Sequence, residues 1–180
     1  MSQPIYLVRH ANAEPRDRWH DDDSKRPLNG KGVRQSRAVA DRFQSGPLGD
    51  RVRTTDAGAP EARPTRLLSS PATRCVDTLH PLSGALGLPI ETFWYLAEGF
   101  DPLACLDRLI EVAVADRGVL VACSHGDVIW GLMAELARRG VPLDAPPDAR
   151  KGSIWALEVE GDTVEDAGVV SGRYIRPMTV

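Results

Sequence analysis

The sequence predicts an α/β protein in which a mainly parallel β-sheet is covered by helices on both faces. Strand-like and helix-like segments alternate along the 180 residues, as they do in consecutive βαβ units. Residues 5–8 and 119–123 are continuous apolar runs, which are typical of strands buried on both faces. A chain of this length is expected to form one domain, and we expect residues 1–180 to be that domain.

Two strand–helix units account for the first half of the chain. Asn29 is a favourable cap for a helix from residue 30 to about 44, which follows the first strand after a polar stretch. Residues 45–64 combine glycine, proline and charge without periodicity, so we expect a long, mobile loop there. A short strand at 66–71 leads into a second helix, and Pro81 is expected to kink or split that helix.

The second half continues the alternation and ends in a hairpin. Periodic apolar residues predict two helices, and short runs bounded by turn residues predict the strands. Gly161-Asp162 is typical of a hairpin turn between the last two strands. The predicted elements are a strand at 90–94, a helix from about 103 to 118, a helix from about 126 to 140, and strands at 153–160 and 163–170.

Composition and charge narrow the classes of function. A net charge of −3 provides no basic surface for nucleic acid, and no apolar stretch approaches the length of a membrane span. Residues 1–4 place no basic segment ahead of the first apolar run, so no signal peptide is expected. Cys75, Cys105 and Cys123 lie within apolar patterns, and no pair of them has metal-ligand spacing. We therefore expect a cytoplasmic protein with free thiols and neither a nucleic-acid nor a membrane partner.

Polar residues of types suited to catalysis or ligand binding follow three of the predicted strands. Arg9-His10 ends the first apolar run, and Ser124-His125-Gly126 ends the run at 119–123. The strand at 66–71 leads into a helix that carries Arg74 in its first turn. Because open α/β sheets bind ligands at the carboxyl ends of their strands, one sheet can bring these two histidines and two arginines together. The sequence thus predicts an anion pocket that contains a candidate nucleophile.

These residue types suit phosphoryl transfer. A neutral imidazole is a competent nucleophile toward phosphorus when the phosphoryl oxygens are neutralised and held still. Arginine suits that task because its planar guanidinium stays charged and contacts two oxygens at once. The neighbouring arginines would also help to keep His10 unprotonated, and His125 would donate to the transferring oxygens. The acid that protonates the leaving group is either Glu98, just after the third strand, or Asp127, two residues past His125.

Each of these residues also has an ordinary structural explanation. An Arg-His pair is often simply surface, Ser124 can cap a helix, and Arg74 can be a solvated helix residue. Glu98 can likewise complement the dipole of a nearby helix. These explanations do not account for the common position of the residues at strand ends.

Two other polar clusters carry weaker signals. His20-Asp21-Asp22-Asp23 contains metal-ligand residue types, but three adjacent acids point in different directions and are typical of a solvated loop, so no metal site is predicted. Arg16 and Arg26 either extend a positive rim that selects anionic substrates or belong to a solvated loop.

Four segments resemble the signatures of the histidine phosphatase superfamily, also called phosphoglycerate-mutase-like. They occur in the same order as in the family, from the first strand to the helix after His125. One of them, which begins at Arg26 and includes Gln35, resembles the family's "PLT…G…Q" segment, which opens the family's first helix. The matching segments are Leu7-Val8-Arg9-His10-Ala11, Leu68-Ser69-Ser70-Pro71-Ala72-Thr73-Arg74, Ser124-His125-Gly126, and Arg26-Pro27-Leu28-Asn29-Gly30-Lys31-Gly32 with Gln35.

The resemblance implies a three-layer α/β/α sandwich and a metal-independent, two-step reaction through phosphohistidine, without a cofactor. Carried over by position, His10 is the nucleophile, and Arg9, Arg74 and His125 bind the phosphoryl group. Glu98 fits the proton-donor position of the mutases. Asp127 only loosely matches the His-Asp pair of the acid phosphatases.

Two departures from the family pattern point away from a sugar-phosphate mutase. Ala11 replaces the glycine of Arg-His-Gly, and Asn12-Ala13 replaces the acidic and hydroxyl residues of the mutases, while Arg16 stands near their asparagine. The chain is most similar to the small SixA-type phosphohistidine phosphatases and to the phosphatase domain fused to some Nudix hydrolases. We therefore expect a phosphatase acting on a small phosphorylated substrate or a phosphohistidine protein. The alternatives are a mutase-like phosphotransferase and a catalytically weak phospho-ligand binding module.

Overall fold

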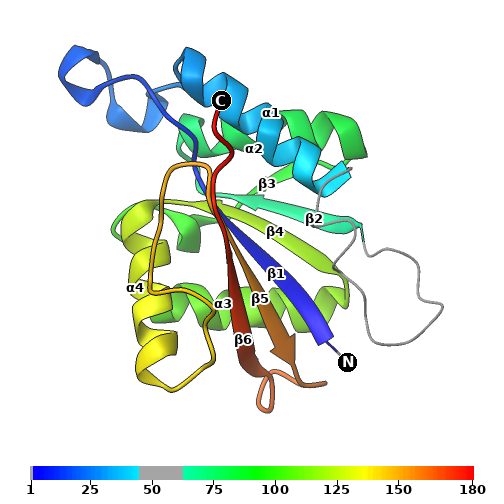
Figure 1. Cartoon of the computed structure of the whole chain (residues 1–180). Helices are drawn as coiled ribbons and strands as arrows, with labels where there is room; N and C mark the ends of the chain where they lie inside the picture. The colour runs from blue at the N-terminus through cyan, green and yellow to red at the C-terminus, as the bar shows by residue number, and fades with distance from the viewer. Residues whose placement is uncertain (1, 45–62) are drawn as a thin grey trace.

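The computed structural model describes residues 2–44 and 63–180 (Figure 1). Most of the predicted 45–64 loop, residues 45–62, lies outside the described residues. The α-helices are α1 (Gly30–Gln44), α2 (Thr73–Leu86), α3 (Pro102–Asp116) and α4 (Gly126–Arg138), and short 3-10 helices are η1 (Arg16–Arg18), η2 (Asp23–Lys25) and η3 (Trp94–Leu96). The strands are β1 (Ser2–Arg9), β2 (Pro64–Ser69), β3 (Ile90–Thr92), β4 (Val119–Ser124), β5 (Ile154–Glu160) and β6 (Gly168–Ile175).

Within the described residues, the strands form one sheet in the order β3-β2-β4-β1-β5-β6. The pairs β3–β2, β2–β4 and β4–β1 are parallel, whereas β1–β5 and β5–β6 are antiparallel. The prediction of a mainly parallel sheet is confirmed. The antiparallel part comes from the C-terminal hairpin, which adds to the free edge of β1.

Helices cover both faces of this sheet, so the molecule has the expected three α/β/α layers (Figure 1). Tyr6 and Val8 face a core shared with α1 and α2, whereas Ile5 and Leu7 face a second core shared with α3 and α4. Because successive side chains of a strand point to opposite faces, a strand buried on both sides has to be apolar at every position. This explains the uninterrupted apolar run at 5–8.

Helix α1 begins as the sequence predicts. The side-chain oxygen of Asn29 accepts a hydrogen bond from the Gly32 backbone N–H at 2.9 Å, which is the geometry of an N-cap. Gly32 also packs against the loop that follows β1, since a Cβ atom there would lie 1.9 Å from the Asn12 carbonyl oxygen. Glycine at this position therefore lets α1 approach the loop that carries His10.

The predicted effect of Pro81 on the second helix is wrong in one respect. Helix α2 runs without a break from Thr73 to Leu86 and contains Pro81. Leu79 and Leu82, on either side of the proline, are fully buried in the core shared with α1. We infer that this burial compensates for the backbone hydrogen bond that proline cannot make.

The third and the sixth strands also differ from their predicted bounds. The third strand ends at Thr92 and is followed by η3, and β6 covers Gly168–Ile175 rather than 163–170. Thr163 lies in a turn instead, because its backbone N–H and its hydroxyl both donate to the Asp166 carboxylate. This local side-chain turn replaces strand pairing at the position where the sequence predicted it.

The described residues contain no helix that is both long and apolar enough to cross a membrane.

Candidate active site

The predicted site residues meet at one edge of the sheet. Arg9 pairs with Ser124 and Ser69 pairs with Cys123 in the parallel ladders, so β1, β2 and β4 end side by side. His10 continues the first ladder, with its backbone N–H donating to the Ser124 carbonyl at 3.0 Å. The carboxyl ends of these strands therefore bring together residues that are far apart in the sequence.

His10 is held in a defined tautomer. Its Nδ1 lies 2.8 Å from the carbonyl oxygen of Ala11, and a carbonyl can only accept a hydrogen bond. The proton therefore resides on Nδ1, and Nε2 keeps its lone pair. The backbone of Ala11 is itself anchored, because its N–H donates to the Thr78 hydroxyl at 2.9 Å.

The surroundings of His10 also keep it neutral. Burial lowers its pKa from 6.5 to about 3, although the hydrogen bond to Ala11 acts in the opposite direction. The nearby His125, Arg74 and Arg9 lower the pKa further, because a second positive charge beside them is unfavourable. An unprotonated imidazole at neutral pH is the form that can attack phosphorus.

Arg74 lies in the first turn of α2 and is almost completely buried. Its Nη1 donates to the backbone carbonyl of Asp23 at 2.8 Å and lies 3.2 Å from that residue's carboxylate. Its Nη2 donates to Glu98 Oε2 at 2.6 Å. The Arg74 guanidinium therefore forms a candidate anion site, which two carboxylates already contact and for which a phosphoryl group would have to compete.

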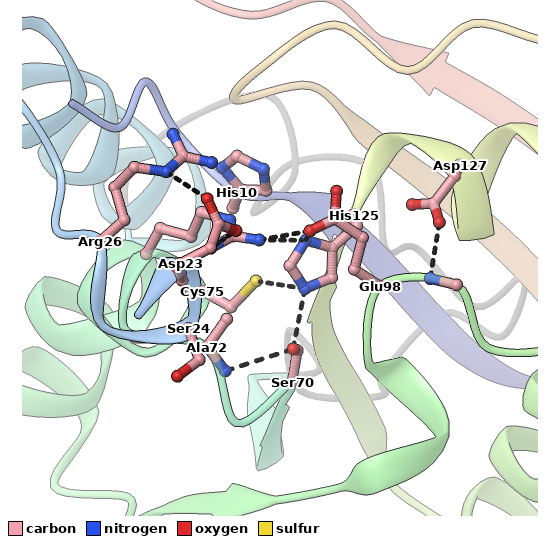
Figure 2. Close-up of polar contacts among 12 residues, drawn as sticks. His10, Asp23, Ser24, Arg26, Ser70, Ala72, Cys75, Glu98, His125 and Asp127 are labelled. Carbon is pink, nitrogen blue, oxygen red and sulfur yellow. Dashed lines mark hydrogen bonds and ion pairs between the residues drawn. The ribbon is translucent and has the colours of Figure 1, made fainter. Parts of the chain in front are cut away.

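His125 is the N-cap of α4 and is buried beside His10, with 5.3 Å between the ring centroids. Its Nε2 lies 2.8 Å from the hydroxyl of Ser70. This contact is drawn as a dashed line in Figure 2. Its Nδ1 faces the position between Arg74 Nη2, at 3.4 Å, and Glu98 Oε2, at 3.9 Å. Ser70 therefore orients the ring so that Nδ1 faces the anion site.

Arg9 approaches the site from the end of β1. Its Nη1 donates to the Ala149 carbonyl, which fixes the guanidinium against the segment before β5. The guanidinium also lies directly over Gly126, where a Cβ atom would come within 2.7 Å of its central carbon. The glycine in Ser124-His125-Gly126 is thus required for the close packing of Arg9 on the start of α4.

The two candidate proton donors have different surroundings. The Glu98 carboxylate lies beside Arg74 and His125 and accepts from Arg16 Nη2 at 2.7 Å. The Asp127 carboxylate instead accepts from the backbone N–H of Gly99 at 2.7 Å (Figure 2). Asp127 therefore holds the loop that carries Glu98, and Glu98 is the acid placed next to the anion site.

Asp23 is a site residue that the sequence did not single out. Its carboxylate bonds to Arg26 Nε at 2.8 Å and lies 3.3 Å from Arg16 Nε, in addition to its contact with Arg74. Burial alone would raise the pKa of the Asp23 carboxyl, but the Arg26 hydrogen bond and the three arginines lower it overall. Arg26 is buried, so it is part of the site rather than of a solvated loop. No sequence signal separated Asp23 from its acidic neighbours.

The neighbouring acids of Asp23 do not converge on a metal site. Asp22 caps the backbone of Ser24, and Asp21 pairs with Lys25 at 3.5 Å. Across residues 2–44 and 63–180 no group of three or more histidine, cysteine or acidic side chains is arranged to hold a metal ion.

Two further side chains near His125 were missed by sequence reasoning. Ser70 belongs to a motif that the resemblance covers, but no role was assigned to it. Cys75, one turn into α2, has its sulfur 3.5 Å from His125 Nε2. Both side chains are buried and contact the ring from the side opposite to the anion site (Figure 2).

The remaining contacts hold the loop after His10 in place. The Gln35 side-chain oxygen accepts from both the backbone and the side-chain amide of Asn12, at 2.9 and 2.7 Å. Its amide nitrogen donates to the Lys151 carbonyl at 3.3 Å. Gln35, the last residue of the segment that begins at Arg26, therefore ties the loop after His10 to the segment before β5.

An open cleft of about 610 Å³ lies over the candidate site. Arg9, His10, Glu98 and His125 are among the residues that line it. This volume falls within the range of small-molecule sites, so the cleft has room for more than a phosphoryl group.

Comparison with protein families agrees with this geometry. The family model for the histidine phosphatase superfamily (branch 1) matches residues 5–100, which is just over half of the 180 residues. The chain belongs to this superfamily. The matched region contains His10, Arg74 and Glu98, whereas His125 lies beyond its end.

A curated relative extends the similarity over nearly the whole chain. The 8-oxo-(d)GTP phosphatase of Mycolicibacterium smegmatis is 30% identical over 179 residues, which cover 98% of this chain and 49% of the relative. The chain therefore spans about half the length of this relative.

Solved structures share the fold. The protein histidine phosphatase SixA in complex with tungstate superimposes with a TM-score of 0.65 at 21% identity, covering 94% of this chain and 95% of that one. A protein assigned as the phosphohistidine phosphatase SixA of Nakamurella multipartitia gives 0.68 at 18% identity, covering 99% and 98%. The predicted phosphoglycerate-mutase-like, SixA-like architecture is confirmed.

Proposed function

We propose that this protein is a metal-independent phosphatase that hydrolyses a phosphomonoester or a phosphohistidine through a covalent phosphohistidine on His10. The observation that carries the proposal is the state of His10: a neutral imidazole with its proton on Nδ1, beside Arg9 and Arg74. Superfamily membership and the phosphatase name of the curated relative support the reaction class.

In the first step, the lone pair of His10 Nε2 forms a bond to phosphorus as the bond to the leaving group breaks. Arg9, Arg74 and His125 Nδ1 bind the phosphoryl oxygens, on which charge is spread in the transition state. The leaving atom takes a proton from Glu98, which has left its arginine partners and taken up a proton from solvent on substrate binding. In the second step, Glu98 removes a proton from water, the water oxygen attacks phosphorus, and the P–N bond breaks to release inorganic phosphate and restore His10.

Glu98 has to change partners during this cycle. In the unliganded arrangement it pairs with Arg74 and Arg16. A phosphoryl group that binds Arg74 would displace the Glu98 carboxylate from Nη2 and place it beside the leaving group. Its side chain is 43% exposed and sits on a loop, so this displacement requires little repacking.

The charge that a metal ion would otherwise supply comes from the arginines in this proposal. Activity should therefore persist after thorough chelation and dialysis. A loss of activity that only magnesium, manganese or zinc restores would overturn the metal-independent mechanism.

The direct test of the proposal is to trap the intermediate. Enzyme incubated with labelled substrate and quenched should carry acid-labile, base-stable phosphate on His10, and His10→Asn should carry none. Label on a serine, a cysteine or His125 would overturn the mechanism.

The alternatives make different predictions with simple substrates. A mutase-like phosphotransferase acts poorly on a generic aryl phosphate, and a binding module does not turn it over. The presence of His10 together with Glu98 argues against the binding module. The three buried free thiols, Cys75, Cys105 and Cys123, fit the proposed cytoplasmic location.

A further inference from the structure

The cleft over His10 has one wall that the phosphoryl chemistry does not use. Trp130 lines this wall, and 56% of its surface is exposed. It lies on α4 one turn after Gly126, so its indole stands next to the site on the same helix that His125 caps. Tryptophan is a large apolar residue that is usually well buried, and an exposed indole in a cleft offers a flat apolar face to a ligand.

The segment between α4 and β5 also contributes to the cleft. Pro147, Asp148 and Ala149 line it, and Pro147 adds an apolar ring. The Arg9 hydrogen bond to the Ala149 carbonyl ties this segment to the catalytic edge. The cleft thus continues from the phosphoryl site into a space with an indole and a proline ring in its walls.

The polar groups in this part of the cleft are acceptors. Asp127 and Asp148 both line it. One oxygen of Asp127 accepts from Gly99, and one oxygen of Asp148 lies 3.0 Å from Arg150 Nε, so each carboxylate has a second oxygen. Carboxylates accept hydrogen bonds from N–H groups and repel further phosphates. The cleft therefore suits a neutral ring that bears N–H donors better than a polyphosphate chain.

We propose that this part of the cleft binds a planar, nitrogen-containing ring of the leaving group, so that the substrate class is a nucleoside monophosphate. The inference rests on the proposed function and specifies its substrate. The ring stacks on Trp130, and its N–H groups donate to Asp148 or Asp127. The phosphate then reaches Arg74 and His10 at the inner end of the cleft.

Binding to the His10→Asn variant tests the subsite without turnover, so its outcome is independent of the catalytic proposal. Calorimetry should show that guanosine monophosphate binds at least about 10-fold more tightly than glycerol phosphate, which has no ring. In the His10→Asn background, Trp130→Ala should reduce this preference about 10-fold, and Trp130→Phe should reduce it less, since a ring remains. Trp94→Ala, which removes an exposed tryptophan outside the cleft, should leave the preference unchanged.

Kinetics on the otherwise unchanged enzyme give a second readout. Trp130→Ala should lower the ratio of kcat/KM for guanosine monophosphate to that for glycerol phosphate. Asp148→Asn should lower kcat/KM for guanosine monophosphate more than kcat/KM for phenyl phosphate, because the phenyl ring has no N–H group. Equal binding of the ring and ringless ligands, or a Trp130 effect confined to a phosphohistidine peptide, would overturn the proposal.

Discussion

The site has an inner and an outer part that differ in burial. The inner part, here the clamp, consists of Arg9, His10, Arg74 and His125, and the last three are at most 6% exposed. The outer part, here the rim, consists of Arg16, Asp23, Glu98 and Trp130, which are all substantially exposed. The clamp comes from strand ends and helix starts, whereas most of the rim comes from short 3-10 helices and loops.

This difference separates two tasks. In the clamp, each of the two imidazoles and Arg74 is held by hydrogen bonds, and electrostatic interactions gain strength from burial. In the rim, exposed ion pairs contribute little to stability, so Arg16 and Glu98 can exchange partners when a substrate arrives. We therefore expect changes in the clamp to abolish chemistry and changes in the rim to alter substrate preference or proton transfer.

The largest effect should come from the clamp arginine. Arg74→Lys keeps the charge but loses the planar fork, and we expect kcat/KM to fall about 10²- to 10³-fold. The matched rim variant Arg16→Lys should lose less than about 10-fold, because an exposed ion pair is weaker. Steady-state kinetics with an aryl phosphate measure both, with thermal unfolding as a check of folding. A larger loss of kcat/KM in Arg16→Lys than in Arg74→Lys would contradict the proposed division of tasks between clamp and rim.

Glu98 is the rim residue whose removal should matter for chemistry. Glu98→Gln should slow hydrolysis of an alkyl phosphate by about 10²-fold and of an aryl phosphate much less, because a good leaving group needs little protonation. Asp127→Asn keeps an oxygen acceptor for Gly99 and should show no dependence on the leaving group. A reversed pattern would make Asp127 the acid, and no dependence in either variant would favour a phosphohistidine substrate.

Burial of a neutral His10 should appear in the pH dependence of stability. The pKa of His10 is about 3 in the folded chain, whereas the ordinary value of 6.5 applies to the unfolded chain. Between pH 3 and pH 6.5, therefore, only the unfolded chain binds the proton. His10 should therefore contribute stability that is full above pH 6.5 and is lost as the pH falls, at about 1.4 kcal/mol per pH unit. The free energy of urea unfolding of the wild type, relative to that of His10→Asn, should therefore fall as the pH is lowered from about 6.5 toward 3.

A control keeps this experiment specific to the clamp. His80→Gln, at an exposed histidine on α2, should leave this pH dependence of stability unchanged. A His10→Asn variant whose stability runs parallel to that of the wild type over this pH range would mean that His10 is not buried in the neutral state.

The smallest effect should come from a residue that acts through another. Ser70→Ala removes one neutral hydrogen bond to His125, and we expect kcat to fall about 2- to 10-fold with little change in KM. Ser70→Thr keeps the hydroxyl and should recover most of the activity. An equal loss in both variants would indicate that Ser70 matters for packing rather than for the orientation of His125.

Much of this arrangement was predictable from the sequence. The apolar runs predicted β1 and β4, and the Asn29 cap predicted the start of α1 at Gly30. The placement of His10 and His125 directly after strands predicted that they would meet. These features depend on local patterns and on the rule that parallel strands end at a common edge.

Other features depended on neighbours that no local pattern reveals. Pro81 lies inside a continuous helix because Leu79 and Leu82 are buried on the same element. The residues at 163–166 form a turn because Asp166 bonds back to Thr163. In both cases a specific contact outweighed the average preference of the residues concerned.

The sequence by itself determined the fold class, the family signatures and the identity of the clamp. The reason is that buried strands are continuous apolar runs, so the residues that follow each run can be located from the sequence alone. Only the tertiary structure decided the tautomer of His10, the partnership of Ser70 with His125, and the placement of Asp23 among three arginines. It also decided that Asp127 supports the Glu98 loop while Glu98 faces the anion site. Apart from the contacts of His10 with Ala11 and of Asp23 with Arg16 and Arg26, these relations join residues that are 24 to 55 positions apart. They depend on distances that arise only when the strands align.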